Sequence, residues 1–177
     1  MQPEEQISSR EIYEGRIINV RVDDILMRNG NTSVREVVDH ANAVVICPID
    51  DDGNVHLVRQ FRYAAKETLL ECPAGLVEEG EDPDDCAQRE LAEEIGYASR
   101  NLRILGGFWS SPGFCTEFMY AYLAKDLIPR SLQADDDEDI QVEKVPLSRI
   151  QQLIRLGEIQ DAKSIAVLLM ATCIFDA

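Results

Sequence analysis

The stretch GLVEEGEDPDDCAQRELAEEIGY, residues 75–97, crowds acidic side chains into a short segment that contains a single arginine, Arg89. Its pattern predicts a helix over residues 83–95. Asp82 is a suitable N-cap, the proline after it suits the first helical position, and Gly96 is a typical left-handed helix terminator. Such a helix needs something to offset the repulsion among its carboxylates.

Three glutamates of the predicted helix share one face. Glu90, Glu93 and Glu94 are separated by three and four residues, the spacing of neighbours on a helix surface. A hard divalent cation, Mg²⁺ or Mn²⁺, would offset their repulsion, because carboxylate oxygens are its preferred ligands. Arg89 could also fix one carboxylate, since it lies four residues before Glu93. On composition alone, a merely solvated acidic helix is the alternative. The opposite face carries an apolar stripe of Ala87, Leu91 and Ile95.

The order of residues in this stretch resembles the signature of the Nudix hydrolases. Gly75 is followed after five residues by Glu81, and after seven more by the run RELAEEIG, residues 89–96. Every fixed position of the family pattern is present. The departure is the last position, where the family prefers an aliphatic residue and this chain has Tyr97.

The resemblance implies a strand-loop-helix-loop unit that binds Mg²⁺, with Mn²⁺ as the alternative ion. Glu90 and Glu94 would be metal ligands, and Glu93 a supporting or third ligand in the catalytic group. The carbonyl of Ala74 would join them, with Gly75 allowing a tight backbone turn beside it. Such enzymes hydrolyse a nucleoside diphosphate that is linked to another group.

Features outside this stretch resemble the ADP-ribose pyrophosphatase subfamily. A proline, Pro112, falls sixteen residues after Gly96, which is the usual marker of the subfamily. Four further segments look like its members, and the resemblance covers roughly residues 12–175. These segments are VRQFRYA (58–64), ECPAG (71–75), DDDEDI (135–140) and IQDAKSIAVLLM (159–170).

Carried over residue by residue, the resemblance implies a set of substrate-binding residues. Arg62 and Arg59 would contact the pyrophosphate, a role that suits the bidentate guanidinium. For Arg59, a solvated strand residue is an equal alternative. Pro112 and Gly113 would belong to the substrate-binding loop, where Glu117 would hydrogen-bond a ribose hydroxyl.

The acidic loop ahead of the last predicted strand would complete the site. Glu138 would be a metal ligand, and the general base that activates water would come from the same loop. Family members place a glutamate at the position of Asp136, whose side chain is one methylene shorter. The base therefore stays open among Asp136, Glu138 and Asp137, and a solvated acidic turn is the alternative for the whole loop.

The rest of the chain predicts an α/β (α+β) fold, a Nudix-type α/β/α sandwich with a mixed β-sheet. Alternating or continuous apolar runs predict strands, and two helices are expected at 148–156 and 162–175. Residues 1–42 would form antiparallel N-terminal strands with an Asn-Gly hairpin, and residues 43–177 the catalytic domain. Residues 1–10 look poorly ordered or adaptable. In relatives of this type the N-terminal strands are exchanged with a second subunit, so we expect a homodimer. The strands are predicted at IINVRVDDILM, SVREVVDH, NAVVICPID, VHLVRQFRYA, TLLECPAG, LRILGGFWS, EFMYAYLAKDL and QVEKVPL.

Composition narrows the partners and the compartment. The net charge of -16 makes nucleic acid and an anionic membrane surface improbable partners. The N-terminus lacks the basic and apolar pattern of a secretory signal, and the longest apolar run is too short to span a bilayer. Five widely spread cysteines without a CxxC spacing are typical of reduced thiols in a cytoplasmic protein.

These features predict a Mg²⁺-dependent enzyme that cleaves the diphosphate of a small nucleotide sugar, ADP-ribose, to AMP and ribose 5-phosphate. The nearest rival is the same chemistry on GDP-mannose or a UDP-sugar. A rival of another class is a sensor that binds ADP-ribose without cleaving it. The intact carboxylates of residues 89–96 argue against a sensor.

Overall fold

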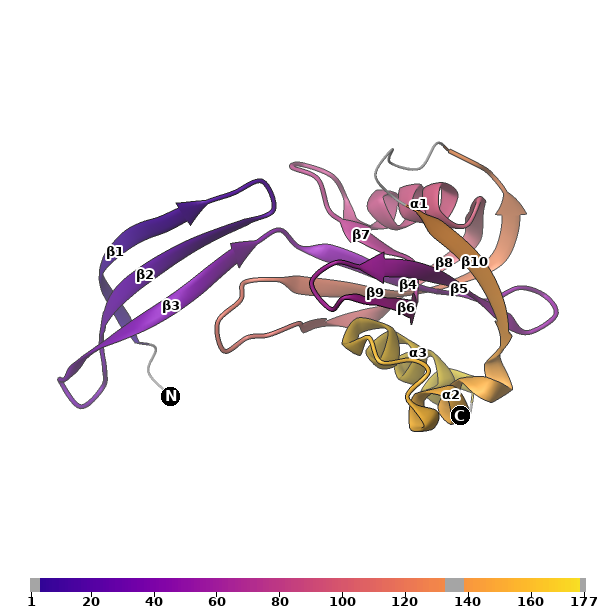
Figure 1. The fold of residues 1–177 in the computed structure, drawn as a ribbon. Coiled ribbons are helices and arrows are strands. Elements are labelled where there is room, and N and C mark those ends of the chain that lie inside the picture. Colours follow the sequence, from indigo (N-terminus) through magenta and orange to yellow (C-terminus); the bar gives the residue numbers. More distant parts are fainter. Residues whose placement is uncertain (1–3, 133–138, 176–177) are drawn as a thin grey trace. The chain divides into compact units, whose positions relative to one another are not determined.

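The computed structural model describes residues 4–132 and 139–175, and its contacts divide the chain into two compact units (Figure 1). The first unit combines Met1–Asn42 with Trp109–Phe118, and the second combines Ala43–Phe108 with Met119–Ala177. The assignment of residues 1–42 to exchanged strands and of 43–177 to a catalytic domain stays a prediction.

The second unit is built on a mixed four-stranded sheet. Its order is β7 (Ala74–Leu76), β4 (Ala43–Pro48), β9 (Phe118–Pro129) and β8 (Tyr97–Trp109). Strand β4 runs parallel to β9 and antiparallel to β7. All six residues of β4 are buried, as the continuous apolar sequence predicts for a strand that is covered on both faces.

Helices cover both faces of this sheet (Figure 1). Val44 and Ile46 of β4 pack in one core with α1 (Pro83–Glu94), whereas Val45 and Cys47 pack in another with α2 (Ile150–Leu156) and α3 (Ala162–Phe175). Successive side chains of a strand point to opposite faces, so one short strand supplies both cores. The predicted α/β/α sandwich is confirmed.

A second, three-stranded antiparallel sheet carries several of the predicted site residues. Its order is β10 (Ile140–Pro146), β5 (Asn54–Arg62) and β6 (Glu67–Glu71). The short 3₁₀ turn η1 (Leu147–Arg149) connects β10 to α2. Only two residues, Cys72 and Pro73, separate the end of β6 from the start of β7. The chain therefore passes directly from this sheet into the four-stranded sheet.

The first unit contains a three-stranded antiparallel sheet of β1 (Glu5–Glu14), β2 (Ile18–Leu26) and β3 (Thr32–His40). The Asn-Gly hairpin lies between β2 and β3 as predicted. The segment Trp109–Phe118 belongs here because it pairs with β3. The amide of Val38 donates to the Phe114 carbonyl at 2.7 Å, and the amide of Thr116 donates to the Val38 carbonyl at 3.0 Å.

The expectation that residues 1–10 are poorly ordered is wrong for the part that the structure describes. Residues 5–10 belong to β1, which pairs along its length with β2. All ten side chains of β1 are exposed, so the strand lacks the apolar alternation that sequence analysis detects. Backbone hydrogen bonds to β2 hold it instead, together with hydrogen bonds from the Ser8 and Ser9 hydroxyls to Asp24 and Asp23 of β2.

The five cysteines, all of them in the described residues, form no disulfide. Cys47, Cys72 and Cys86 are buried, and burial raises the pKa of Cys47 and of Cys86 to about 12. In the described ranges, none of the helices has the length and hydropathy needed to cross a membrane.

Candidate active site

Helix α1 begins and ends as its sequence predicts. The Asp82 side chain accepts a hydrogen bond from the Asp84 amide at 2.8 Å, and Pro83 occupies the first turn. The Asp84 carboxylate in turn accepts a hydrogen bond from the buried Tyr122 hydroxyl of β9 at 2.6 Å. Gly96 follows the helix with φ of 74°, a conformation that favours glycine. The helix start is thus fixed both locally and against the sheet.

The two faces of α1 separate core from carboxylates. Its apolar stripe is fully buried against β4. Glu90 and Glu94 are each 7% exposed, and Glu93 lies at the more open edge of the same face. Buried carboxylates are expensive unless hydrogen bonds or positive charge compensate them. This face therefore needs cations.

The carboxylate of Glu90 lies directly against Gly75 of β7. A β-carbon added to Gly75 would overlap the Glu90 carboxylate, whose three terminal atoms are its nearest neighbours. Gly75 lies within the extended strand β7, so the tight turn predicted there is absent, whereas Gly80 in the following loop has a positive φ of 81°. Glycine is needed at position 75 to leave room for a carboxylate beside the Ala74–Gly75 peptide.

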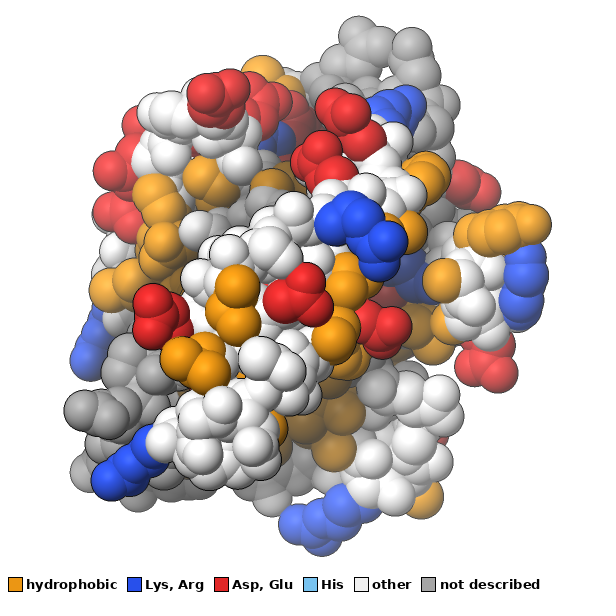
Figure 2. Space-filling view, turned by 90° about the vertical axis from the view of Figure 1, so that its left-hand side faces the viewer, with side chains coloured by type: hydrophobic (Ala, Val, Ile, Leu, Met, Phe, Trp, Pro, Cys, Tyr) orange, Lys and Arg blue, Asp and Glu red, His pale blue; other side chains and the backbone are white. Residues whose placement is uncertain are grey.

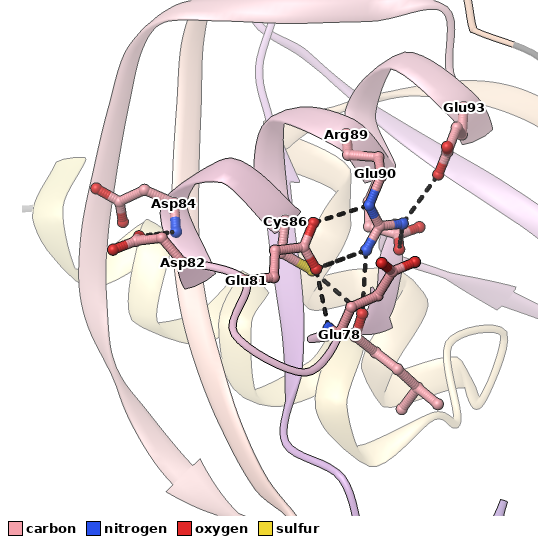
Figure 3. Close-up of polar contacts among 9 residues, drawn as sticks. Glu78, Glu81, Asp82, Asp84, Cys86, Arg89, Glu90 and Glu93 are labelled. Carbon is pink, nitrogen blue, oxygen red and sulfur yellow. Dashed lines mark hydrogen bonds and ion pairs between the residues drawn. The ribbon is translucent and has the colours of Figure 1, made fainter.

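Arg89 is the centre of a group of ionic contacts that we call the helix cluster, with Glu81, Glu90 and Glu93 (Figure 3). Its Nε and Nη2 bind the two Glu81 oxygens at 2.9 and 3.0 Å. Its Nη1 donates to Glu90 Oε1 at 2.6 Å and to Glu93 Oε2 at 3.1 Å. The sequence predicts the link to Glu93, but the structure adds two further carboxylates. One guanidinium thereby fixes three side chains.

The helix cluster also orders the loop before α1. Hydrogen bonds from Arg89 lower the pKa of Glu81 to about 2, so this carboxylate stays ionised. Glu81 Oε2 accepts a further bond from the Glu78 amide at 2.9 Å, and Arg89 Nη2 donates to the Leu76 carbonyl at 3.1 Å. The side chains of Glu78 and Glu79 are exposed. Of the three glutamates in this loop, Glu81 is therefore structural, whereas the side chains of Glu78 and Glu79 are solvated.

A second group, the strand cluster, consists of Arg62, Glu71, Asp161 and Lys163. Arg62 binds both oxygens of Glu71 at 2.8 Å each. Lys163 bridges Glu71 and Asp161, with 3.0 Å between Nζ and Asp161 Oδ2. The charge of Glu94 contributes to raising the pKa of Arg62, after the larger effect of Glu71, so Arg62 lies within electrostatic range of α1.

The remaining predicted substrate-binding residues that the structure describes lie outside both clusters. Arg59 of β5 donates to Glu143 of β10 at 2.6 Å, and both side chains are 41% exposed. Glu117 lies in the first unit with Pro112 and Gly113, and its Oε1 is 3.5 Å from His40 Nδ1. Asp136, Asp137 and Glu138 lie outside the described residues.

Two family models cover almost the whole chain. The NUDIX domain matches residues 39–168, and the nucleoside diphosphate sugar hydrolase N-terminal domain matches residues 4–38. The chain belongs to the Nudix family. As a Nudix hydrolase, it is an enzyme that acts on pyrophosphate bonds.

Named relatives of this Nudix hydrolase act on nucleotide compounds. It is 37% identical over 163 residues to an ADP-ribose pyrophosphatase of Bacillus subtilis (strain 168), covering 91% of this chain and 88% of the relative. It is 33% identical to a GDP-mannose pyrophosphatase of Citrobacter koseri (strain ATCC BAA-895 / CDC 4225-83 / SGSC4696), covering 82% of each chain. The crystal structure of an ADP compounds hydrolase matches with a TM-score of 0.91 and 25% identity, covering 99% of this chain and 96% of that one.

Nudix hydrolases generally depend on a divalent metal ion, and the donors on α1 suit one. Glu90 and Glu94 supply two buried carboxylates, and the Ala74 carbonyl belongs to the peptide against which Glu90 lies. Oxygen donors of this kind favour hard divalent cations. Residues 4–132 and 139–175 contain no group of three or more His, Cys, Asp or Glu arranged to hold a metal. A third carboxylate, predicted at Glu138, lies outside these ranges.

The sequence analysis missed the strand cluster as a group. Glu71 and Lys163 lie in the segments ECPAG and IQDAKSIAVLLM, in which the resemblance implies no role for either residue. One feature of the sequence could have indicated this cluster, namely the glutamate at the end of the apolar run TLLE. If that glutamate is buried, its charge requires a cationic partner. The sequence does not indicate which cation that partner is.

Proposed function

We propose that this Nudix hydrolase cleaves the diphosphate of ADP-ribose to AMP and ribose 5-phosphate, with Mg²⁺ as its divalent ion. The observation that carries the proposal is the pair of buried carboxylates, Glu90 and Glu94, on one face of α1. Their spacing and burial suit an ion that binds phosphate oxygens, which an acidic protein would otherwise repel. Similarity to an ADP-ribose pyrophosphatase supports the choice of substrate.

One group of residues would hold the divalent ion, and Arg89 would orient two of the carboxylates beside it. Glu90 and Glu94, the Ala74 carbonyl and Glu138 would hold the ion, which when bound stabilises negative charge on the phosphates and lowers the pKa of a water. Arg89 keeps Glu90 and Glu93 oriented through its hydrogen bonds. This orientation is established before substrate arrives, so little reorganisation is needed during the reaction.

Other residues would bind the substrate and move the proton. Arg62 donates hydrogen bonds to the pyrophosphate, with Arg59 as a second, more exposed candidate. Glu117, in the loop with Pro112 and Gly113, accepts a bond from a ribose hydroxyl. A carboxylate of the acidic loop takes the proton of the attacking water, and the candidates remain Asp136, Glu138 and Asp137.

The same proposal includes a cytoplasmic homodimer. Free cysteines suit a reducing compartment. The sheet of the first unit exposes large apolar side chains, and hydrophobic side chains are visible among charged ones in the space-filling view (Figure 2). Apolar surface of this kind favours an interface between subunits. The exposed apolar residues in this sheet and beside it include Ile7, Ile12, Tyr13, Ile17, Ile18, Leu26 and Val34. Sedimentation of the purified protein tests the dimer, and a monomer across the micromolar range would contradict it.

A substrate panel with product identification tests the function. The protein is incubated with Mg²⁺ and, separately, ADP-ribose, GDP-mannose and UDP-glucose, and products are identified by chromatography. We expect AMP and ribose 5-phosphate from ADP-ribose, at a higher kcat/KM than for the other two, and no product when EDTA removes the ion.

Each other outcome of the panel selects a rival. Preferred cleavage of GDP-mannose would assign the second candidate, which similarity to a GDP-mannose pyrophosphatase favours. Tight binding of ADP-ribose that is recovered intact in the presence of Mg²⁺ would indicate a sensor. Absence of AMP while another nucleotide sugar is cleaved would overturn the substrate assignment alone.

A further inference from the structure

Glu71 is a buried carboxylate for which the proposed reaction has no direct use. It ends β6 and is 1% exposed, yet it contacts cations from two other elements, Arg62 of β5 and Lys163 of α3. Arg62 lies nine residues from Glu71 on the paired strand, whereas Lys163 lies 92 residues away in the sequence. An ionised carboxylate with so little solvent contact persists only where its partners compensate its desolvation.

The contact between Glu71 and Arg62 fixes the plane of the guanidinium. Arg62 Nε donates to Glu71 Oε1 and Arg62 Nη2 donates to Glu71 Oε2, both at 2.8 Å. Two parallel bonds of this kind define the position and the orientation of both groups. Lys163 also donates to Glu71 Oε2, so the carboxylate is held from a second side.

The third nitrogen of Arg62 is left for another partner. Arg62 Nη1 makes no hydrogen bond to any residue in the described ranges, and the side chain is 40% exposed. The residue is also within electrostatic range of Glu94 on α1. A guanidinium fixed by two nitrogens can present the third to an anion beside the carboxylates of α1.

Glu71 itself is unsuited to act on the substrate. Its oxygens already accept hydrogen bonds from Arg62 and Lys163, and it is buried from solvent. Burial would raise its pKa, but hydrogen bonds from Arg62 and the charge of Lys163 outweigh this and lower it. A carboxylate so stabilised in its ionised form is a poor general base.

We propose that Glu71 is a positioning residue, which orients Arg62 so that Nη1 faces the pyrophosphate, while Lys163 offsets the negative charge of Glu71. The inference rests on the proposed function, in which Arg62 binds the substrate. A free arginine side chain has many rotamers, and restricting them before binding lowers the entropic cost of each substrate contact. Glu71 thereby acts through Arg62 and without touching the substrate.

A double-mutant cycle on Glu71→Gln and Arg62→Ala tests this proposal. We expect Arg62→Ala to raise KM by about 100-fold, because it removes a charged hydrogen bond to the substrate. Glu71→Gln alone should raise KM by about tenfold, with kcat changed less than about threefold, because it removes orientation and leaves the chemistry intact. In the Arg62→Ala background, Glu71→Gln should change KM by less than about twofold.

Two further variants control for folding. Glu67→Gln makes the same change on the same strand at an exposed position, so we expect wild-type KM. Arg62→Lys leaves Glu71 intact and keeps the charge but loses the two-bond contact, so its KM should lie within about threefold of that of Arg62→Ala. If Glu71→Gln fails to fold, Arg62→Lys still decides, because wild-type KM in that variant would overturn the proposal.

The outcomes separate this inference from the proposed function. Effects of Glu71→Gln that are equal in both backgrounds would assign Glu71 a structural role and overturn the inference alone. The cycle is measured on whichever nucleotide sugar the wild type cleaves, so preference for GDP-mannose leaves it intact. Failure of the wild type to cleave or bind any nucleotide sugar would overturn the proposed function, and the inference with it.

Discussion

The helix cluster and the strand cluster both pair arginine with glutamate, but they are assembled in different ways. The helix cluster comes from one segment, residues 81–93, and is formed by the turn of α1 and the loop before it. The strand cluster joins residues from β5, β6 and α3, spread over residues 62–163. Local chain geometry therefore determines the first cluster, whereas the second also needs the distant helix α3 to pack against the paired strands β5 and β6.

The most deeply buried carboxylate of the two clusters is Glu71 of the strand cluster. Glu81 and Glu93 of the helix cluster keep 16% and 22% of their side chains exposed, whereas Glu71 keeps 1%. Glu71 therefore depends strongly on the cations that contact it. This comparison leads us to expect the largest losses of kcat from the carboxylates of α1, and effects on KM and on stability from the strand cluster.

The largest effect is expected from Glu94→Gln, which neutralises one buried carboxylate on the face of α1. The side chain keeps its size, but it loses the charge that would hold a divalent ion. We expect kcat for ADP-ribose to fall by about 10³-fold, with a normal circular dichroism spectrum. The control Glu79→Gln changes an exposed loop residue and should leave kcat unaltered. Activity within tenfold of wild type would exclude Glu94 as a metal ligand.

The second-largest effect is expected from Gly75→Ala. This substitution tests whether the position of the Glu90 carboxylate matters for catalysis. The added methyl group would overlap that carboxylate and force it away from the Ala74–Gly75 peptide. Displacement of a catalytic group by about 1 Å costs about 10²-fold in rate, so we expect kcat/KM to fall by about this factor. Unfolding in urea should show a loss of about 1–3 kcal/mol of stability.

A matched background makes the Gly75→Ala result specific. In Glu90→Ala, the atoms nearest to the added methyl group are gone, so Gly75→Ala should cost little stability there. An equal loss in both backgrounds would show that the close approach of Glu90 is not the reason for glycine at this position.

Arg89→Met should have a smaller effect, on stability, because it removes the shared partner of three carboxylates. We expect the free energy of unfolding to fall by about 2–3 kcal/mol at pH 7. Arg89 lowers the pKa of Glu81 from 4.5 to about 2, so this stabilisation is present above pH 4.5 and is lost as the pH falls towards 2. The difference between wild type and variant should shrink over that range. A constant difference would exclude Glu81 as the titrating partner.

The smallest effect is expected from Lys163→Met, which removes one of the two cations of the strand cluster. Glu71 keeps its two bonds to Arg62, so we expect a loss of about 1–2 kcal/mol of stability by thermal unfolding. KM should rise less than for Glu71→Gln, because the plane of Arg62 is still fixed. A rise in KM larger than that of Glu71→Gln would mean that Lys163 itself contacts the substrate. The strand cluster would then bind the substrate through both of its cations.

The parts of the fold that were predicted well have local signals. The helix start at Asp82, the hairpin after β2 and the buried strand β4 each follow from a cap, a turn or an apolar run. β1 has no such signal because its side chains are all exposed, and it is held by backbone pairing with β2 and by hydrogen bonds from Ser8 and Ser9 to Asp24 and Asp23. Sequence patterns report side-chain burial, so they miss an element that is held by hydrogen bonds alone.

In the candidate site, too, the features with a local sequence signal were predicted and those without one were not. The face of Glu90, Glu93 and Glu94 follows from helix spacing, and the resemblance to Nudix hydrolases gives its role. The reason for Gly75 was predicted to be a turn, but the structure shows space for a carboxylate. Glu71 was missed because a glutamate at a strand end is usually exposed.

By itself, the sequence determined the family and the carboxylate face of α1, because both depend on short-range spacing, and the order of its predicted strands and helices indicated the mixed sheet between helices. Only the tertiary structure decided which cations Glu71 receives. Arg62, Glu71 and Lys163 meet because β5 pairs with β6 and α3 packs beside them, and no local pattern encodes that meeting. An ion pair between distant residues depends on distances in space, which the fold sets through the packing of its core.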